Sequence, residues 1–363
     1  MTSPGHQYRP QAGNPTAERA LESYREEFPV LSRKTYLISA SLGPISNRAR
    51  ASLREFLDVW AAEGAPDIVW MEHIFPKMGA LKRSFARLAR CDADEFAITA
   101  NVSVALATIA TCLDYSKRRK VVMSELDFPT DGHVWLAQRR RGVEIVWLRS
   151  PDGLTIPLKA YDEAIDDETA VVMVNRVLYR SSALLDAKEI CRMARERGAY
   201  SFVDDYHGAG IVPLDVHDLR CDFYTTGVLK WLCGGPGLGF LFARRELLSG
   251  LEPMVTGWLA TRDPFSFDYD HLDLHPTARR LEHGTPAAPS VFLAQGGLDV
   301  ILEVGVERIR ARQSELTEYL IARADAAGLP VRTPRNPADR GGVVNVGVGP
   351  QADRICRALL ERG

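Results

Sequence analysis

The chain has 363 residues and a formal net charge of −2, with 46% hydrophobic and 25% charged residues. This composition is ordinary for a globular protein, and the length allows one sizeable domain plus a smaller one. Because no basic excess is available to neutralise phosphates, a general nucleic-acid or membrane-surface role is not expected. The six cysteines lack Cys-x-x-Cys spacing, so no zinc site or disulfide framework is predicted and a reducing cytoplasm is expected.

Strands and helices are predicted to alternate along most of the chain. Residues 1–16 are polar with Pro and Gly and show no signal-peptide pattern, so we expect a flexible arm there; no apolar run has transmembrane length. Short apolar runs predict strands at residues 36–44 (running into a turn), 96–99, 120–124, 143–148, 170–175, 199–203 and 343–346. Helical spacing predicts helices at residues 17–27, 47–63, 76–90, 104–113, 131–141, 158–165, 186–197, about 298–327 and 353–360. This alternation predicts an α/β fold with a mostly parallel sheet between helices.

An acidic residue and a lysine stand at the ends of apolar runs in the middle of the chain. Asp204 ends the run that begins at Phe202, and Lys230 lies between two later runs. Chemistry with pyridoxal phosphate (PLP) needs a lysine to hold the aldehyde as a Schiff base and a carboxylate to keep the ring nitrogen protonated. Taken alone, the same pattern also describes a buried strand end and a surface lysine.

Polar or aromatic residues follow several of the predicted strands. Ser103, Phe128, Asn175 and Asp204 come just after four of them, so we expect these residues to meet at the carboxyl edge of the sheet. The turn at Asn101 to Ser103 leads into a helix, where unpaired N–H groups suit an anion. A plain helix cap explains that turn equally well.

Motifs spread over roughly residues 28 to 350 resemble the class V aminotransferase group of fold-type I PLP enzymes, which includes kynureninase-like, isopenicillin-N-epimerase-like and cysteine-desulfurase-like members. The matching motifs are Tyr36-Leu37 to Gly43-Pro44, Asn101-Val102-Ser103, Glu125-x-Asp127-Phe128-Pro129-Thr130, Asp204-x-x-His207, Lys230-Trp231-Leu232 with its Gly-Pro-Gly-x-Gly sequel, Gly257-Trp258, and Arg280-x-Glu282-x-Gly284-Thr285-Pro286. The resemblance implies a large PLP-binding domain at 28–250 with a seven-stranded, mostly parallel sheet. A small α+β domain would span 251–363 and appear cut short at its end, with residues 28–45 packing against it and 1–27 forming an arm and short helix.

The resemblance also implies a role for each site residue. Lys230 would carry the Schiff base and move the Cα proton, and Asp204 would pair with the pyridinium nitrogen. The remaining residues would bind the cofactor: His207 near the phenolic oxygen, Phe128 on the ring face, Asn175 nearby, and Val102 and Ser103 at the phosphate. Trp258 and Thr285 would reach the phosphate from the neighbouring subunit, which implies a homodimer with shared active sites.

Some positions depart from the family pattern. Val228 and Gly227 replace hydroxyl residues, so Thr225 or Thr226 would supply a phosphate contact instead. The late cysteine, Cys356, falls in a predicted helix rather than on a reactive loop, which disfavours desulfuration. No match to the family's carboxylate-binding arginine is visible before Gly363, so either the sequence is incomplete or the substrate is held differently; Arg176 and Arg180 are candidates, alongside ordinary structural roles.

The sequence therefore predicts a PLP-dependent enzyme that acts through a quinonoid at Cα of an amino acid or a related metabolite. Transamination, kynureninase-type Cβ–Cγ hydrolysis, β-elimination and epimerisation all remain open, because each branches from the same carbanion. An inactive PLP-fold dimer that serves as a binding or regulatory partner is the alternative. A dinucleotide-dependent dehydrogenase is excluded, because the glycines at 234–239 follow the lysine and precede a strand.

Overall fold

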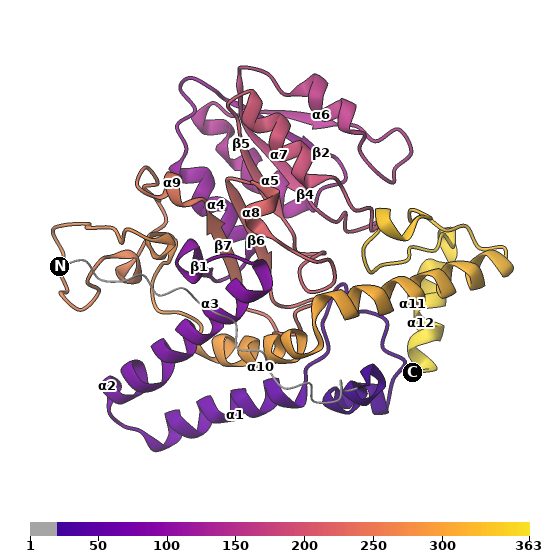
Figure 1. Ribbon diagram of the computed structural model, residues 1–363, viewed down its shortest axis with the longest axis horizontal. Helices are drawn as coiled ribbons and strands as arrows, with labels where there is room; N and C mark the ends of the chain where they lie inside the picture. The colour runs from indigo at the N-terminus through magenta and orange to yellow at the C-terminus, as the bar shows by residue number, and fades with distance from the viewer. Residues whose placement is uncertain (1–19) are drawn as a thin grey trace, which may run out of the picture.

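The computed structural model describes residues 20–363, and a seven-stranded sheet stands at its centre (Figure 1). The strand order across the sheet is β1-β7-β6-β5-β4-β2-β3. Six of the strands point the same way, and only β7, which is antiparallel to both of its neighbours β1 and β6, runs in the opposite direction. The strands are β1 (Phe96–Thr99), β2 (Lys120–Ser124), β3 (Glu144–Leu148), β4 (Thr169–Asn175), β5 (Tyr200–Asp204), β6 (Phe223–Gly227) and β7 (Gly239–Ala243). The predicted mostly parallel α/β sheet is confirmed.

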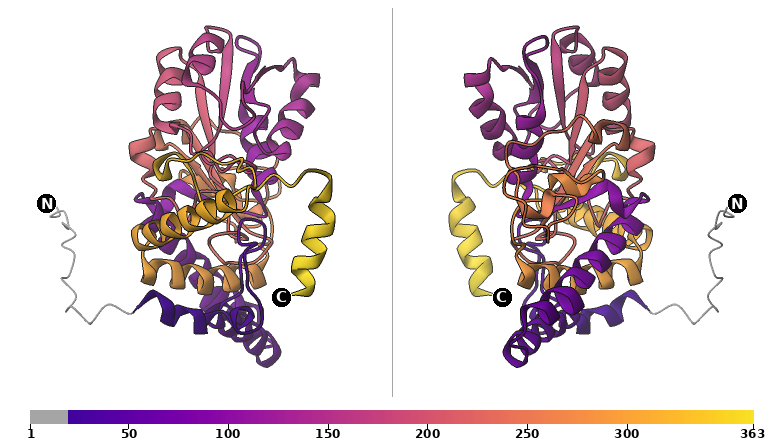
Figure 2. Two further views of the ribbon diagram at one scale, coloured as in Figure 1. Left: turned by 90° about the vertical axis from the view of Figure 1, so that its right-hand side faces the viewer. Right: turned by 90° about the vertical axis from the view of Figure 1, so that its left-hand side faces the viewer.

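The central strands are apolar on both faces because helices cover both sides of the sheet. Val171 and Met173 of β4 pack in one apolar cluster with α4, whereas Val172 and Val174 pack in a second cluster with α7 and α10. Successive side chains of a strand point to opposite faces, so a continuous apolar run serves both layers. Figure 2 shows these layers from the side.

The helices agree closely with the periodicity of the sequence. Their bounds are α1 (Asn47–Ala62), α2 (Pro66–Ile68), α3 (Phe75–Ala89), α4 (Val102–Cys112), α5 (Pro129–Ala137), α6 (Leu158–Ala164), α7 (Ala187–Glu196), α8 (Val216–Leu219), α9 (Arg245–Leu248), α10 (Ala288–Val304), α11 (Val306–Ala326) and α12 (Ala352–Glu361). A π-helix at Val69–Ile74 joins α2 to α3, and a 3-10 helix at Leu21–Glu27 precedes α1. The expected arm at residues 1–16 lies outside the described residues.

The first and last parts of the chain lie side by side below the sheet (Figure 1). Helix α1 packs along α10, and the rings of Phe56 and Phe292 are 5.3 Å apart at this contact. A methyl group added at Gly296 would come within 2.5 Å of the Ala49 main chain, so the two helices approach as closely as a bare glycine allows. The division into domains at residue 250 stays a prediction.

Three sequence-based elements were wrong. The long helix expected at about 298–327 is two helices bent by 79°, because Gly305 takes a left-handed φ of 85° between them. No strand forms at residues 36–44: within residues 20–363 this segment has no strand to pair with, and Leu37 is 81% exposed. The strand expected at 343–346 is reduced to an isolated bridge between Val331 and Val346.

By length and composition, no single helix among residues 20–363 could cross a membrane, although the bent pair α10 and α11 passes the same test when taken together.

Candidate active site

Lys230 lies in the turn between β6 and β7 and is only 8% exposed. Its Nζ atom is 2.5 Å from Nε2 of His207, and it lies 4.3 Å from the ring centre of Tyr206 and 5.3 Å from that of Phe128. Burial lowers the pKa of Lys230 to about 8, while the carboxylates of Asp204 and Asp131 act in the opposite direction. A lysine in this state exchanges a proton readily near neutral pH.

His207 faces this amine as a neutral ring. Burial, reinforced by the positive charge of Lys230, lowers the pKa of His207 to about 3. Its Nδ1 atom is buried and has no hydrogen-bond partner among the described residues. A neutral imidazole with one nitrogen free can accept or donate a hydrogen bond to a bound group.

Asp204 ends β5 and is 4% exposed. Its Oδ1 atom accepts the N–H of Tyr206 at 2.8 Å. Burial raises the pKa of Asp204, whereas this hydrogen bond and the charge of Lys230 oppose the rise. The predicted carboxylate therefore lies where the sequence placed it, at the carboxyl edge of the sheet.

A second buried carboxyl group, Asp131, pairs with Asp204. Asp131 is fully buried on α5, and the carboxyl groups of the two residues interact directly. Burial, together with the negative charges of Asp204 and Asp127, raises the pKa of Asp131. Two like charges this close cannot both persist, and because the pKa of Asp131 is raised further than that of Asp204, Asp131 is the protonated member of the pair.

Sequence reasoning missed Asp131, although a signal was present. This residue opens the predicted helix after Phe128-Pro129, and a carboxylate in that first turn is an ordinary helix-capping feature. Its three-residue spacing from Phe128 places both residues on one side of the helix start. That spacing could have identified Asp131 as a second acid beside the ring-stacking position.

Asn175 connects the residues of the site. It ends β4 in register with Asp204, and its Nδ2 atom donates to Asp131 Oδ2 at 2.5 Å. Its Oδ1 atom accepts the N–H of Phe128 at 3.3 Å, which fixes the loop that carries the aromatic ring. Phe128 itself is 38% exposed, so its ring is accessible to solvent.

The start of α4 offers an anion site next to this group. Asn101 caps the helix by accepting the N–H of Val104 at 3.0 Å, and Val102 and Ser103 form the first turn. Ser103 is exposed, and its hydroxyl lies 3.1 Å from that of Thr130, which is in the first turn of α5, two residues after Phe128. First-turn N–H groups and two hydroxyls together suit a phosphate.

The two threonines of β6 are placed differently from the other predicted phosphate contacts. Thr225 and Thr226 are both fully buried in the sheet. The hydroxyl of Thr225 donates to the Phe240 carbonyl at 2.9 Å, and that of Thr226 lies 3.4 Å from the carbonyls of Asp205 and Gly227. Their hydroxyls serve main-chain carbonyls, so their predicted contact with phosphate stays a prediction.

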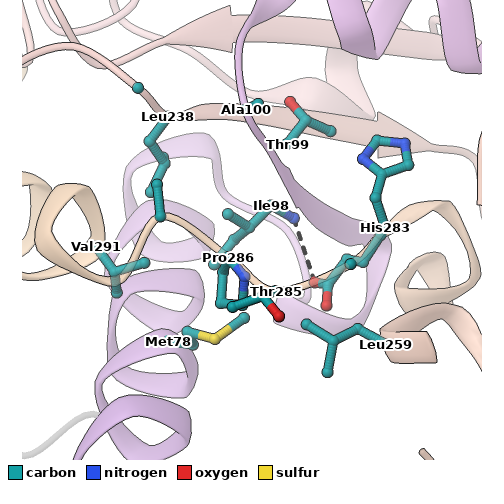
Figure 3. Close-up of a pocket in the computed structure, with 14 residues that line it drawn as sticks. Met78, Ile98, Thr99, Ala100, Leu238, Leu259, His283, Thr285, Pro286 and Val291 are labelled. Carbon is teal, nitrogen blue, oxygen red and sulfur yellow. Dashed lines mark hydrogen bonds between the residues drawn. The ribbon is translucent and has the colours of Figure 1, made fainter. Parts of the chain in front are cut away.

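Trp258 and Thr285 do not contact the group around Lys230 within residues 20–363. Trp258 packs in an aromatic cluster with Trp70, Phe75 and Phe265, at ring distances of 5.9–6.4 Å. Thr285 is exposed and lines a small cavity of about 90 Å³ beside Thr99, as Figure 3 shows. Thr99 and Ala100 of this cavity lead directly into the turn at Asn101.

Glu282 also lines that cavity, and its Oε1 atom accepts the Ile98 N–H at 3.2 Å, the bond drawn as a dashed line at Ile98 in Figure 3. The same oxygen pairs with Lys82 at 3.3 Å. His283 completes the arrangement through its Nε2 atom, 3.0 Å from the Thr108 hydroxyl on α4. The Arg280 to Pro286 motif is therefore joined to the strand and helix that flank the turn at Asn101 to Ser103.

Arg176 is not available to a ligand. Its guanidinium is buried, lies 2.8 Å from Asp205 Oδ2 and also bonds the Pro213 carbonyl. Tyr224 donates to the same carboxylate oxygen at 3.1 Å. Removing one partner of such a buried pair would leave an uncompensated charge. Arg176 therefore has an ordinary structural role, which the sequence had left open beside substrate binding.

The residues around Lys230 fit PLP by chemistry and by what they leave unpaired. A buried lysine with a lowered pKa, a carboxyl pair, a partly exposed aromatic ring and a helix start lie within one group. Asp131 Oδ1 and His207 Nδ1 are buried without partners among the described residues, as expected where a polar ring belongs. This combination suits a cofactor that carries an aldehyde, a ring nitrogen and a phosphate.

Comparison with known proteins supports this class. Residues 35–362 match the aminotransferase class V family, so the chain belongs to that family. It is 33% identical to an uncharacterized aminotransferase of Bacillus subtilis over 312 residues, covering 86% of this chain and 81% of that protein. It is 28% identical to a kynureninase of Geobacillus thermodenitrificans over 365 residues, covering 95% and 84%. The resemblance inferred from the motifs is confirmed, and the protein is homologous to PLP-dependent enzymes.

Solved structures share the fold at lower identity. An apo cysteine desulfurase from Thermococcus onnurineus matches with a TM-score of 0.84 at 22% identity, covering 95% of this chain and 86% of that one. A variant of the cystine C–S lyase C-DES with glycine covalently linked to its PLP cofactor matches with a TM-score of 0.86 at 20% identity, covering 93% and 90%. The predicted fold-type I architecture is confirmed.

Proposed function

We propose that the protein is a PLP-dependent enzyme that acts at Cα of an amino acid or an amino-acid-derived metabolite. One observation carries the proposal: Lys230 Nζ lies 2.5 Å from a neutral His207 and is flanked by the ring of Phe128 and the Asp131–Asp204 pair. Lys230 would hold PLP through its Nζ atom, and Val102 and Ser103 would hold the phosphate. When bound, PLP withdraws electrons from the bond that breaks at the substrate Cα.

The chain's own residues supply the proton chemistry. Lys230 has a pKa near 8, so after an incoming substrate amine displaces it, its Nζ can take the proton from Cα. Because the pKa of Asp131 is raised further than that of Asp204, Asp204 is the more acidic of the two carboxyl groups. Asp204 would therefore be the carboxylate that keeps the ring nitrogen of PLP protonated, and the low pKa of His207 would let this ring hydrogen-bond the cofactor without adding charge.

The curated relatives support two outcomes equally. An aminotransferase and several kynureninases are similar to the chain at 28–33% identity, so transamination and Cβ–Cγ hydrolysis of a kynurenine-type substrate are both candidates. The two outcomes make different demands. Transamination would need an oxo acid as a second substrate to take up the amino group. Hydrolysis would consume only water besides the amino-acid substrate.

The test is the absorbance spectrum of the purified protein mixed with PLP, compared with Lys230→Ala. We expect a long-wavelength band that is absent from Lys230→Ala and present in Lys159→Ala, an exposed lysine on α6. L-kynurenine and a panel of amino acids are then added, with and without an oxo acid, and products are identified by mass. Continued release of product without an oxo acid indicates cleavage of the substrate. Product formation that depends on the oxo acid indicates transamination.

A protein that takes up no PLP would overturn the enzyme proposal. A protein that binds PLP through Lys230 but shifts its spectrum with none of the amino acids would favour the dimeric binding partner instead.

A further inference from the structure

Arg180 lies at the rim of the group around Lys230. It follows Tyr179 in the loop after β4, and its guanidinium carbon lies 5.3 Å from the Tyr179 ring centre. The Tyr179 ring meets Phe128 edge-on at 5.2 Å and lies 6.2 Å from the ring of His207. Tyr179 thus contacts both the guanidinium of Arg180 and the rings of Phe128 and His207.

The two arginines of this loop differ in what they bind. Arg176 is buried and neutralised by Asp205, whereas Arg180 is exposed and forms no ion pair with any residue of the described range 20–363. Stacking on Tyr179 occupies only the face of its guanidinium, so the edge that carries the N–H groups remains available. Such an edge matches a carboxylate in a two-bond geometry.

The main chain of this loop is fixed by the late segment of the protein. Asn345 Nδ2 donates to the Arg180 carbonyl at 3.1 Å. Two residues on, the Ser182 carbonyl accepts the Gly341 N–H at 2.7 Å, and its hydroxyl accepts the Val343 N–H at 3.0 Å. Ser182 is held at a positive φ of 64° by these contacts. A loop held at both sides presents its side chains at a defined position, which reduces the entropy lost on binding.

We propose that Arg180, stacked on Tyr179, binds the carboxylate of the amino-acid substrate and so selects amino acids over simple amines. This inference rests on the proposed function, since it concerns the same site. Arg180 acts as a substrate-binding residue, and Asn345 acts through it as a positioning residue.

The test compares L-alanine with ethylamine, two primary amines that differ by a carboxylate. Each is titrated into the PLP-loaded protein, and the dissociation constant is read from the shift of the cofactor band. Arg180→Gln is expected to weaken L-alanine by about tenfold or more, the effect of losing a charge-assisted hydrogen-bond pair, and to leave ethylamine within about twofold. Arg180→Lys should fall between them because it keeps the charge and loses the planar fork.

Arg139→Gln is the matched control, because Arg139 lines a hollow with Arg119 and Glu144 at the amino ends of β2 and β3, the opposite edge of the sheet. It should change neither constant. If Arg180→Gln loses affinity equally for L-alanine and ethylamine, or loses none for either, the carboxylate role is overturned. The proposed function would still stand in that case, because the cofactor band itself would be present. Absence of the band in the unaltered protein would instead overturn the proposed function.

Discussion

Gly43 lies directly against the main chain of Lys230. A methyl group added at Gly43 would come within 2.0 Å of the Lys230 carbonyl oxygen and 2.7 Å of that of Leu229. The Gly43 N–H donates to the same Leu229 carbonyl at 2.8 Å. The segment before α1 is therefore fastened to the turn that carries the lysine, and only a residue without a side chain fits at this contact.

Gly43→Ala is expected to destabilise the protein and to shift Lys230. Main-chain atoms stand in the way of the new methyl group, so the two segments must separate, at a cost of about 1–3 kcal/mol or more. Calorimetry should give a lower Tm, and titration with PLP should give a larger dissociation constant. Gly64→Ala is the control, because a methyl group there meets nothing within 4 Å. Similar Tm values for the two variants would show that the contact is not close in solution.

The Asp131–Asp204 pair predicts unequal effects of two similar substitutions. Asp131 is protonated, so Asp204 carries the negative charge of the pair. Asp204→Asn removes that charge, and kcat/KM should fall by about a hundredfold or more, as for a lost charge at a reacting group. Asp131→Asn keeps a hydrogen-bond donor beside Asp204 and should cost less than about tenfold. Steady-state kinetics on the substrate found above provides the measurement. A larger loss in Asp131→Asn than in Asp204→Asn would mean that Asp131 carries the charge, and equal losses would contradict the predicted division of roles.

Asp127 predicts a pH-dependent effect on stability. It is buried on the loop before Phe128, and burial raises its pKa to about 8, against an ordinary value near 4. Between those two values the folded state binds more protons than the unfolded state, so this residue costs increasing stability as the pH rises from about 4 to about 8. Its Oδ2 atom accepts the Ser124 N–H at 2.8 Å, a bond that asparagine can also accept.

Asp127→Asn should therefore raise Tm relative to the unaltered protein at pH 8 and much less at pH 5. Thermal unfolding at both values measures this difference. The exposed Asp162→Asn on α6 should show little change at either pH. A difference that is the same at both pH values would place the pKa of Asp127 near that of an ordinary aspartate.

The sheet and the positions of Asp204 and Lys230 at the ends of apolar runs could be predicted from local patterns, whereas the role of His207 came from the resemblance to the family. Apolar runs such as 120–124 are continuous, since both faces of the strand are buried, and parallel strands bring their carboxyl ends to one edge whatever lies between them. The acid of β5 and the amide of β4 are neighbours in register for that reason.

What the sequence did not predict depends on contacts between distant segments. Helical periodicity continues through Gly305, so the bend there follows from a backbone conformation that the pattern does not encode. The raised pKa of Asp131 depends on its meeting Asp204 and Asn175, which come from two other elements. The choice between Arg176 and Arg180 likewise depended on a distant contact, because the sequence around Arg176 does not show that its guanidinium meets Asp205.

Trp258 and Thr285 lead to the prediction of shared active sites. Neither residue contacts the Lys230 group within residues 20–363, and the aromatic cluster of Trp258 continues into the exposed rings of Phe265 and Phe267. Exposed aromatic surface of this kind suits burial by another subunit. We therefore expect a homodimer in which Trp258 of one subunit serves the Lys230 of the other.

Mixed dimers test this arrangement. Lys230→Ala and Trp258→Ala chains with different tags are produced together, and dimers carrying both tags are isolated. If Trp258 acts across the interface, one of the two sites contains both natural residues, so the mixed dimer should recover up to about half of the natural activity while each homodimer stays low. If Trp258 acts within its own chain, no site is complete and the mixed dimer stays as inactive as the Lys230→Ala protein.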